Sequence, residues 1–131
     1  MKISNAEIEK LSISPALIAL GKNKEFPANI SYRIALFMAV LLPVIDVYQK
    51  VKLELIIKYC DKDEKGLPII TNNQYFFTEH KEIFNVEFEK LQAEENNIPG
   101  KLELSLNVLP VGLLSSFEMR DLMSIVEFKE D

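Results

Sequence analysis

The sequence predicts an α+β fold, and three observations lead to that prediction. Apolar residues recur at helical spacing from about residue 28 to Cys60, a second helical pattern spans about 78–95, and residues 101–108 alternate between apolar and polar. Such a mixture favours helices packed beside a small, mostly antiparallel sheet. At 131 residues and 48% apolar, the chain has the size and composition of one domain, which we expect to cover residues 1–131.

Two helices are expected in the first half. Ser14 followed by Pro15 is typical of a helix start and Gly21 of a helix stop, which predicts a short helix over 15–20. The long helix that follows carries an apolar stripe. The stripe consists of residues 34, 38, 41, 45, 48, 55 and 59. Pro43 lies inside this helix and is expected to kink it or to split it in two, because proline lacks the amide donor.

The second helix is expected to pair with the first. Residues 67–71 and 74–77 flank Asn72-Asn73, and two asparagines can adopt the positive φ of a tight turn, so a β-hairpin is predicted there. Thr78 is expected to cap a helix running to about Glu95. The two helices would then form an antiparallel helical hairpin with the β-hairpin at its tip.

The last part of the chain predicts a strand followed by a helix. Leu102, Leu104, Leu106 and Val108 alternate with polar residues over 101–108. Ser115 and Glu118 have the spacing of a capping box, so a C-terminal helix is expected to run to about Phe128.

The apolar run from Ile34 to Ile45 is too short to cross a membrane, which needs about 20 apolar residues. Arg33 and Asp46 close the run at its two ends. A helix that is apolar all round is buried on every side, either by its own domain or by another chain. Burial within the domain is favoured, and an interface stays open. The N-terminus has no apolar segment typical of a signal peptide.

The net charge of −5 argues against direct nucleic-acid binding, because phosphate contacts require a surplus of Lys and Arg. Charge is also uneven. Residues 1–60 hold 8 basic and 5 acidic groups, whereas residues 61–131 hold 7 basic and 15 acidic groups. The acidic groups of the second helix predict either a solvated face or an acidic surface that meets a basic partner. They are Glu79, Glu82, Glu87, Glu89, Glu94 and Glu95.

No constellation of catalytic, cofactor-binding or metal-binding residues is found. Cys60 and His80 are the sole cysteine and histidine, too few for a structural zinc site or a disulfide, and nothing in the sequence pairs them. The four glycines do not form a phosphate-binding loop. Residues 61–66 resemble the start of a calcium loop, but Lys65 and Asn72 replace ligands that such a loop needs, so a polar turn is favoured.

The aromatic cluster at the β-hairpin is a candidate contact site. In a strand Tyr75 and Phe77 face one way and Phe76 the other, so at least one ring is expected to be exposed. Exposed aromatic side chains are good contact anchors. Burial of the whole cluster is equally compatible with the sequence.

The chain resembles a group of small phage-encoded and prophage-encoded proteins of unknown function. The resemblance lies in the segments that flank the two predicted helices and in the acidic C-terminus. These segments are Phe26-Pro27-Ala28-Asn29-Ile30-Ser31-Tyr32, Lys58-Tyr59-Cys60-Asp61-Lys62-Asp63-Glu64-Lys65-Gly66, Phe84-Asn85-Val86-Glu87-Phe88, and Glu127 with Glu130-Asp131. The group implies no mechanism.

We therefore expect a non-catalytic protein-binding module, foremost a phage-encoded inhibitor of a host defence protein with an acidic and partly apolar surface. A virion or assembly protein is the alternative, and a small enzyme the second alternative. The partner would be a host or phage protein, with no membrane, and a homo-oligomer stays open; the location would be the host cytoplasm or the virion. The expected partner-binding residues are Tyr75, Phe77, Glu87, Glu94 and Glu95.

Overall fold

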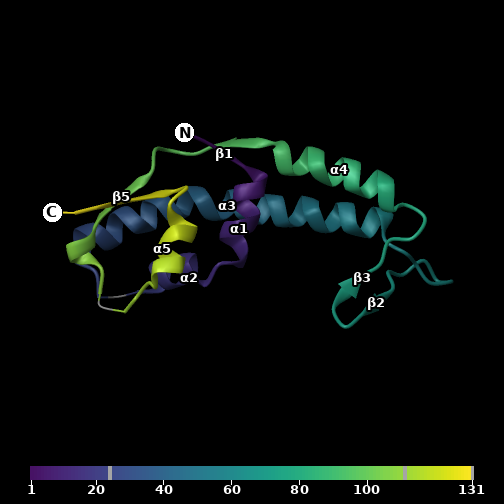
Figure 1. Ribbon diagram of the computed structural model, residues 1–131, viewed down its shortest axis with the longest axis horizontal. Helices are drawn as coiled ribbons and strands as arrows, with labels where there is room; N and C mark the ends of the chain where they lie inside the picture. The colour runs from purple at the N-terminus through teal and green to yellow at the C-terminus, as the bar shows by residue number, and fades with distance from the viewer. Residues whose placement is uncertain (24, 111, 131) are drawn as a thin grey trace.

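One long helix, α3 (Ala28–Tyr59), organises the molecule (Figure 1). The structure is a computed structural model that describes residues 1–23, 25–110 and 112–130. Helix α2 (Pro15–Lys22), helix α5 (Ser116–Leu122) and a pair of strands lie along the N-terminal half of α3, while α4 (Lys81–Ala93) lies along its C-terminal half. Helices and short strands together confirm the predicted α+β fold class.

The predicted helical hairpin is confirmed. Gln92 Nε2 donates a 2.7 Å hydrogen bond to the Tyr48 hydroxyl, and Lys52 Nζ lies 5.9 Å from the centroid of the Phe88 ring. Residues advance along α3 as they recede along α4, so the two helices are antiparallel. Strands β2 (Ile70–Thr71) and β3 (Gln74–Tyr75) form the β-hairpin near the connected ends of the helices (Figure 1).

The turn of this β-hairpin follows the prediction, whereas the start of α4 does not. Asn72 has φ 52° and Asn73 φ 61°, the positive values that a two-residue turn of this kind requires. Thr78, however, does not cap α4: the helix begins at Lys81, and His80 occupies the cap position without a side-chain hydrogen bond to it. Thr78 donates to the Asp61 carboxylate instead.

Helix α3 continues through Pro43, so the predicted split is wrong. Pro43 lies on the exposed side of the helix, where water can hydrate the carbonyl of Ala39 that has lost its donor. On the opposite side of α3, side chains before and after the proline pack in the core. Ile34, Phe37, Leu41, Ile45 and Tyr48 are all buried there.

The N-terminal segment forms elements that the sequence patterns did not predict. Strand β1 (Lys2–Ser4) leads into helix α1 (Asn5–Ile13), and the Ser4 side chain caps α1 by accepting from the Glu7 N–H at 3.3 Å. Strand β1 pairs antiparallel with β4 (Glu95–Asn97), with Ser4 opposite Glu95. The predicted second helix therefore ends two residues early, because residues 95–97 extend to form this strand.

Ser14 caps α2 as predicted, accepting from the Ala16 N–H at 3.2 Å, but Gly21 does not end the helix, which runs to Lys22. A Cβ atom at Gly21 would lie 3.0 Å from Met38 Cε. The glycine therefore leaves room for the end of the Met38 side chain between α2 and α3.

The C-terminal region corrects the prediction most. Strand β5 (Leu102–Ser105) passes into a 3₁₀ turn (Leu106–Val108), so the strand is shorter than expected. The capping box of Ser115 and Glu118 opens α5 as predicted, but α5 ends at Leu122, and β6 (Val126–Lys129) replaces the expected end of the helix. Strand β6 runs parallel to β5, with Leu102 opposite Val126.

Within the described residues, the strands form three separate two-stranded sheets rather than one sheet. The pairs β1–β4 and β2–β3 are antiparallel, and β5–β6 is parallel. The hydrophobic core lies between one face of α3 and the elements that cover it. Its most completely buried side chains are Ile8, Leu11, Leu20, Leu41, Leu104, Leu122, Ile125 and Val126.

Candidate functional site

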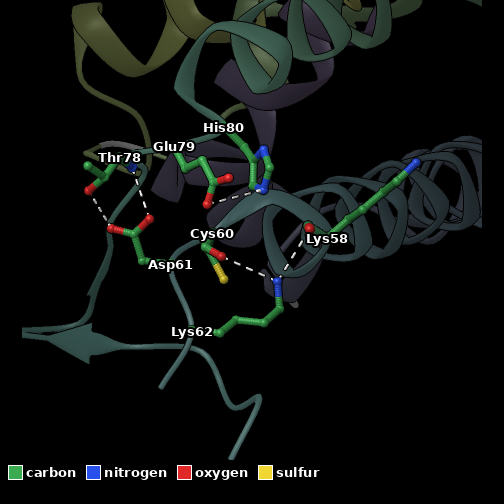
Figure 2. A network of polar contacts seen from close by, with 7 residues as sticks. All are labelled: Lys58, Cys60, Asp61, Lys62, Thr78, Glu79 and His80. Atoms are coloured by element: carbon green, nitrogen blue, oxygen red, sulfur yellow. Dashed lines mark hydrogen bonds and ion pairs between the residues drawn. The ribbon is translucent and has the colours of Figure 1, made fainter. Parts of the chain in front are cut away.

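A polar pocket lies where α3 ends (Figure 2). It has a volume of about 540 Å³ and is lined by the end of α3 and by the segment that precedes α4. Its polar side chains are Lys58, Asp61, Lys62, Thr78, Glu79 and His80. This pocket is the place where the structure gathers groups capable of chemistry, so its hydrogen bonds decide whether it can be a catalytic site.

Asp61 has a structural role in this pocket. Its carboxylate accepts from the Thr78 N–H at 2.9 Å and from the Thr78 hydroxyl at 2.6 Å. These bonds, together with the nearby charges of His80 and Lys62, hold the pKa of Asp61 below its ordinary value. The Asp61 N–H also donates to the Phe76 carbonyl at 2.7 Å. Asp61 thus fixes the β-hairpin against the end of α3 and is not a free acid or base.

Cys60 and His80, which the sequence did not pair, both line this pocket, but they do not form a nucleophilic site. The Cys60 side chain is buried, and its Sγ lies 3.7 Å from the Ile57 carbonyl oxygen. In Figure 2 the thiol points away from the His80 ring, whose Nε2 lies 4.0 Å from a Glu79 carboxylate oxygen. An imidazole must reach the thiol to activate it, so this arrangement supports no Cys–His chemistry.

The segment that resembles a calcium loop is a closed polar turn. Asp63 Oδ1 accepts from the N–H groups of Lys65 and Leu67 at 2.9 and 3.0 Å, and Gly66 has φ 79°. The carboxylate therefore satisfies backbone donors of its own turn. Over residues 1–23, 25–110 and 112–130, no group of three or more His, Cys, Asp or Glu side chains is placed to hold a metal ion.

The aromatic residues of the β-hairpin alternate as the sequence predicted. Phe76 is the exposed ring, with 41% of its surface accessible, while Tyr75 and Phe77 are partly buried. Phe77 stacks on Phe84 of α4, with ring centroids 4.1 Å apart. Tyr75 and Phe77 were the two rings expected to contact a partner, but Phe77 packs inside the molecule. The more accessible ring is that of Phe76, which was not among the expected contact residues.

The three acidic residues expected to bind a partner lie on two different elements. Glu87 is on α4, where its carboxylate lies 3.6 Å from the ammonium group of Lys90. Glu94 is the cap residue that follows α4, and Glu95 begins β4; both are exposed. Exposed carboxylates therefore lie at the end of α4, and the acidic partner surface stays a prediction.

The main exposed feature of the fold is an apolar surface on α3. Helical spacing of four, three, four and four residues places five side chains on one exposed arc, which we call the α3 stripe: Leu36, Val40, Pro43, Val47 and Val51. Leu36 is 53% exposed and Val47 63% exposed. The expectation that the domain buries the run 34–45 on every side is therefore wrong, because the neighbouring elements cover one face of α3 and leave this one open.

An apolar groove of about 270 Å³ between α2 and α3 enlarges the apolar surface, lined by Leu17, Ile18 and Leu42 among others. By length and composition alone, α3 is also able to cross a membrane, and 33% of its most apolar stretch is buried inside the domain. The core helix of a soluble protein passes the same test of length and composition.

Comparisons of the chain with protein-family models, with curated proteins and with solved structures find no match. The resemblance to phage-encoded and prophage-encoded proteins therefore stays a prediction from sequence patterns. The exposed features on which a function can rest are the α3 stripe and the acidic residues at the end of α4.

Proposed function

We propose that this protein is a non-catalytic protein-binding module and that the α3 stripe is its main contact surface. The observation that supports the proposal is the exposure of apolar side chains at helical spacing along the longest helix. Full burial of a Val or Leu side chain contributes roughly 1.5–3 kcal/mol, so covering several half-exposed side chains of the stripe favours association. A contiguous apolar patch of this kind is typical of a protein interface.

Within this class, the first candidate is a phage-encoded inhibitor of a host defence protein, located in the host cytoplasm. The exposed carboxylates of Glu94 and Glu95 support it, because they lie close together at the end of α4 and can meet a basic surface. Phe76 adds an exposed ring at the β-hairpin. Binding of this type weakens steeply as salt screens the charges.

The second candidate is a virion or assembly protein. The α3 stripe favours it, because an apolar stripe at spacings of three and four residues suits packing against another helix. Binding through such a surface depends little on salt, since it rests on burial of apolar area rather than on charge. Salt dependence therefore separates the two candidates.

The proposed function is tested by capture from a host lysate with three variants. Val47→Asp places a charge on the α3 stripe, and Val86→Asp is the matched control on α4, where Val86 is 51% exposed. The third variant reverses Glu87, Glu94 and Glu95 to Lys. We expect Val47→Asp to lose a protein that the wild type and Val86→Asp both retain. Equal capture by Val47→Asp and wild type would exclude a host protein as the occupant of the α3 stripe, and loss in the Lys variant alone would favour the acidic inhibitor.

A further inference from the structure

We propose that the α3 stripe binds the same stripe of a second copy of this chain, with the two α3 helices antiparallel about a two-fold axis between Pro43 and Val44. The inference rests on the proposed function, since it names the occupant of the α3 stripe. Self-association through one shared surface is the commonest route to a closed dimer. The arrangement of apolar and charged residues along α3 supports such a dimer.

The α3 stripe is nearly symmetric about its own midpoint. In an antiparallel pair, residues equally distant from the two-fold axis lie opposite each other. Leu36 then faces Val51 of the second copy, and Val40 faces Val47. At 100° per residue the stripe side chains fall within an arc of about 80°, narrow enough to form one seam between two helices. Each apolar side chain of the stripe therefore meets an apolar side chain.

Charged residues at the two ends of the stripe complement each other in this arrangement. Arg33 precedes the stripe and Glu54 follows it; both lie on the same arc, both are exposed, and both are equally distant from the proposed axis. Arg33 of each copy thus faces Glu54 of the other, giving two symmetric ion pairs. Within the described part of the chain neither side chain makes an ion pair of its own.

The same charges disfavour the neighbouring arrangements. A slip of one helical turn in one direction places Arg33 opposite Lys50, and a slip in the other direction places it opposite Lys58. A parallel pair in register would bring Arg33 next to its own counterpart and Glu54 next to its own. Like charges in each of these arrangements oppose binding, so the antiparallel register centred between Pro43 and Val44 is the one that the charge pattern selects.

The rest of the fold leaves this surface accessible. The elements that pack on α3 contact the face that carries Ile34, Leu41 and Tyr48. In Figure 1, α3 runs along the long axis of the molecule, and the stripe side chains on its other face are exposed, Leu36 by 53% and Val47 by 63%. A second α3 can therefore approach over the whole distance from Arg33 to Glu54, about 32 Å at 1.5 Å per residue.

The register is tested by charge reversal. The mass of the purified full chain in solution is measured by sedimentation velocity from dilute solution up to the solubility limit, for the wild type, Arg33→Glu, Glu54→Arg and the double variant. We expect a wild-type dimer, a dissociation constant at least about fivefold higher in each single variant, and recovery in the double variant, because it restores both ion pairs in reverse. Lys101→Glu, a reversal outside α3, is the matched control, and circular dichroism checks that every variant is folded.

Three results would overturn the inference. The first is a wild-type chain that is monomeric at every concentration. If Val47→Asp then still loses a captured protein, the proposed function stands and the stripe binds a different partner. The second is a dimer whose dissociation constant is unchanged in Arg33→Glu and in Glu54→Arg, which would exclude this register. Binding of monomers to neutral phosphatidylcholine vesicles, without a dimer in solution, would show that lipid covers the stripe. If the chain is monomeric and Val47→Asp captures as the wild type does, both proposals fail.

Discussion

The side-chain amide of Asn96 donates a 2.8 Å hydrogen bond to the side-chain carbonyl oxygen of Asn5, across 91 positions of sequence. Asn5 is buried, and its own Nδ2 donates to the Leu91 carbonyl at 2.8 Å. The Asn5 N–H donates to the Glu94 carbonyl, also at 2.8 Å. These bonds join the first turn of α1 to the end of α4, and they make Asn5 the polar anchor of the N-terminal segment.

Replacing Asn5 with Ala should lower the free energy of unfolding by about 1–3 kcal/mol, because the change removes the hydrogen bonds that the Asn5 side chain makes with the Leu91 carbonyl and with the Asn96 amide. Asn97→Ala is the matched control, since Asn97 lies on β4 next to Asn96 and has an exposed side chain. Urea denaturation followed by circular dichroism measures both variants. Equal stability of the two would mean that the hydrogen bonds of Asn5 contribute nothing in solution.

The two faces of α3 predict opposite outcomes for the same substitution. Leu41 is 1% exposed, so Leu41→Asp buries a charge and should unfold the domain, at a cost comparable with its whole stability of about 5–15 kcal/mol. Leu36→Asp, at a position 53% exposed, should leave the fold intact and change only association. Circular dichroism with size-exclusion chromatography distinguishes unfolding from dissociation. A folded Leu41→Asp protein would show that this face of α3 is not core.

A second polar network joins α1 to α3. Lys52 Nζ donates to a Glu9 carboxylate oxygen at 2.5 Å. Burial raises the pKa of Glu9, but the hydrogen bonds from Lys52 and Tyr48 and the charge of Lys52 outweigh it, so the pKa lies below its ordinary value of 4.5. The ionised carboxylate thus stabilises the fold above that value, and this contribution is lost as the pH falls through the lowered pKa.

Lys52→Met should therefore lower the unfolding free energy at neutral pH by about 1 kcal/mol and flatten its decline below pH 4.5. The thioether keeps most of the side-chain volume, which limits the change to the lost charge and hydrogen bond. Urea denaturation over a series of pH values gives both quantities. A decline as steep as that of the wild type would assign the acid sensitivity to other groups.

Local signals in the sequence predicted the parts of the fold that depend on neighbours in the chain. The turn at Asn72-Asn73 and the cap at Ser14 were predicted correctly because each is decided within a few residues. Strand β1 pairs with β4, and β5 pairs with β6, across long stretches of sequence. Residues 126–129 alternate between apolar and polar, but four residues are too few to separate a strand from the end of a helix, so their pairing with β5 decides.

The candidate surface could be predicted in part. The sequence showed that the run 34–45 is apolar all round, but periodicity alone does not reveal which side the domain covers. The α3 stripe has its own spacing, from Leu36 to Val51, and a search for a second stripe would have found it. The polar pocket could not be predicted, because Asp61 and Thr78 are brought together by the geometry of the β-hairpin between them.

The hydroxyl of Thr78 is the first cause of the lowered pKa of Asp61, ahead of the Thr78 N–H and the charges of His80 and Lys62. Thr78→Val removes this hydroxyl and keeps the backbone donor and the branched shape, whereas Thr78→Ser retains the hydroxyl as a matched control. We expect the pKa of Asp61 to rise toward its ordinary value of 3.8 in the Val variant and to stay low in the Ser variant. The ionised carboxylate of Asp61 stabilises the folded state above pH 3.8, and this contribution is lost as the pH falls through the lowered pKa. Since the pKa is closer to 3.8 in the Val variant, that variant should lose its β-hairpin at a higher pH than the wild type. Carboxyl ¹³C NMR titration measures the pKa of Asp61, and hydrogen exchange at Thr71 measures the loss of the β-hairpin. An unchanged titration in Thr78→Val would show that the hydroxyl does not bind the carboxylate in solution.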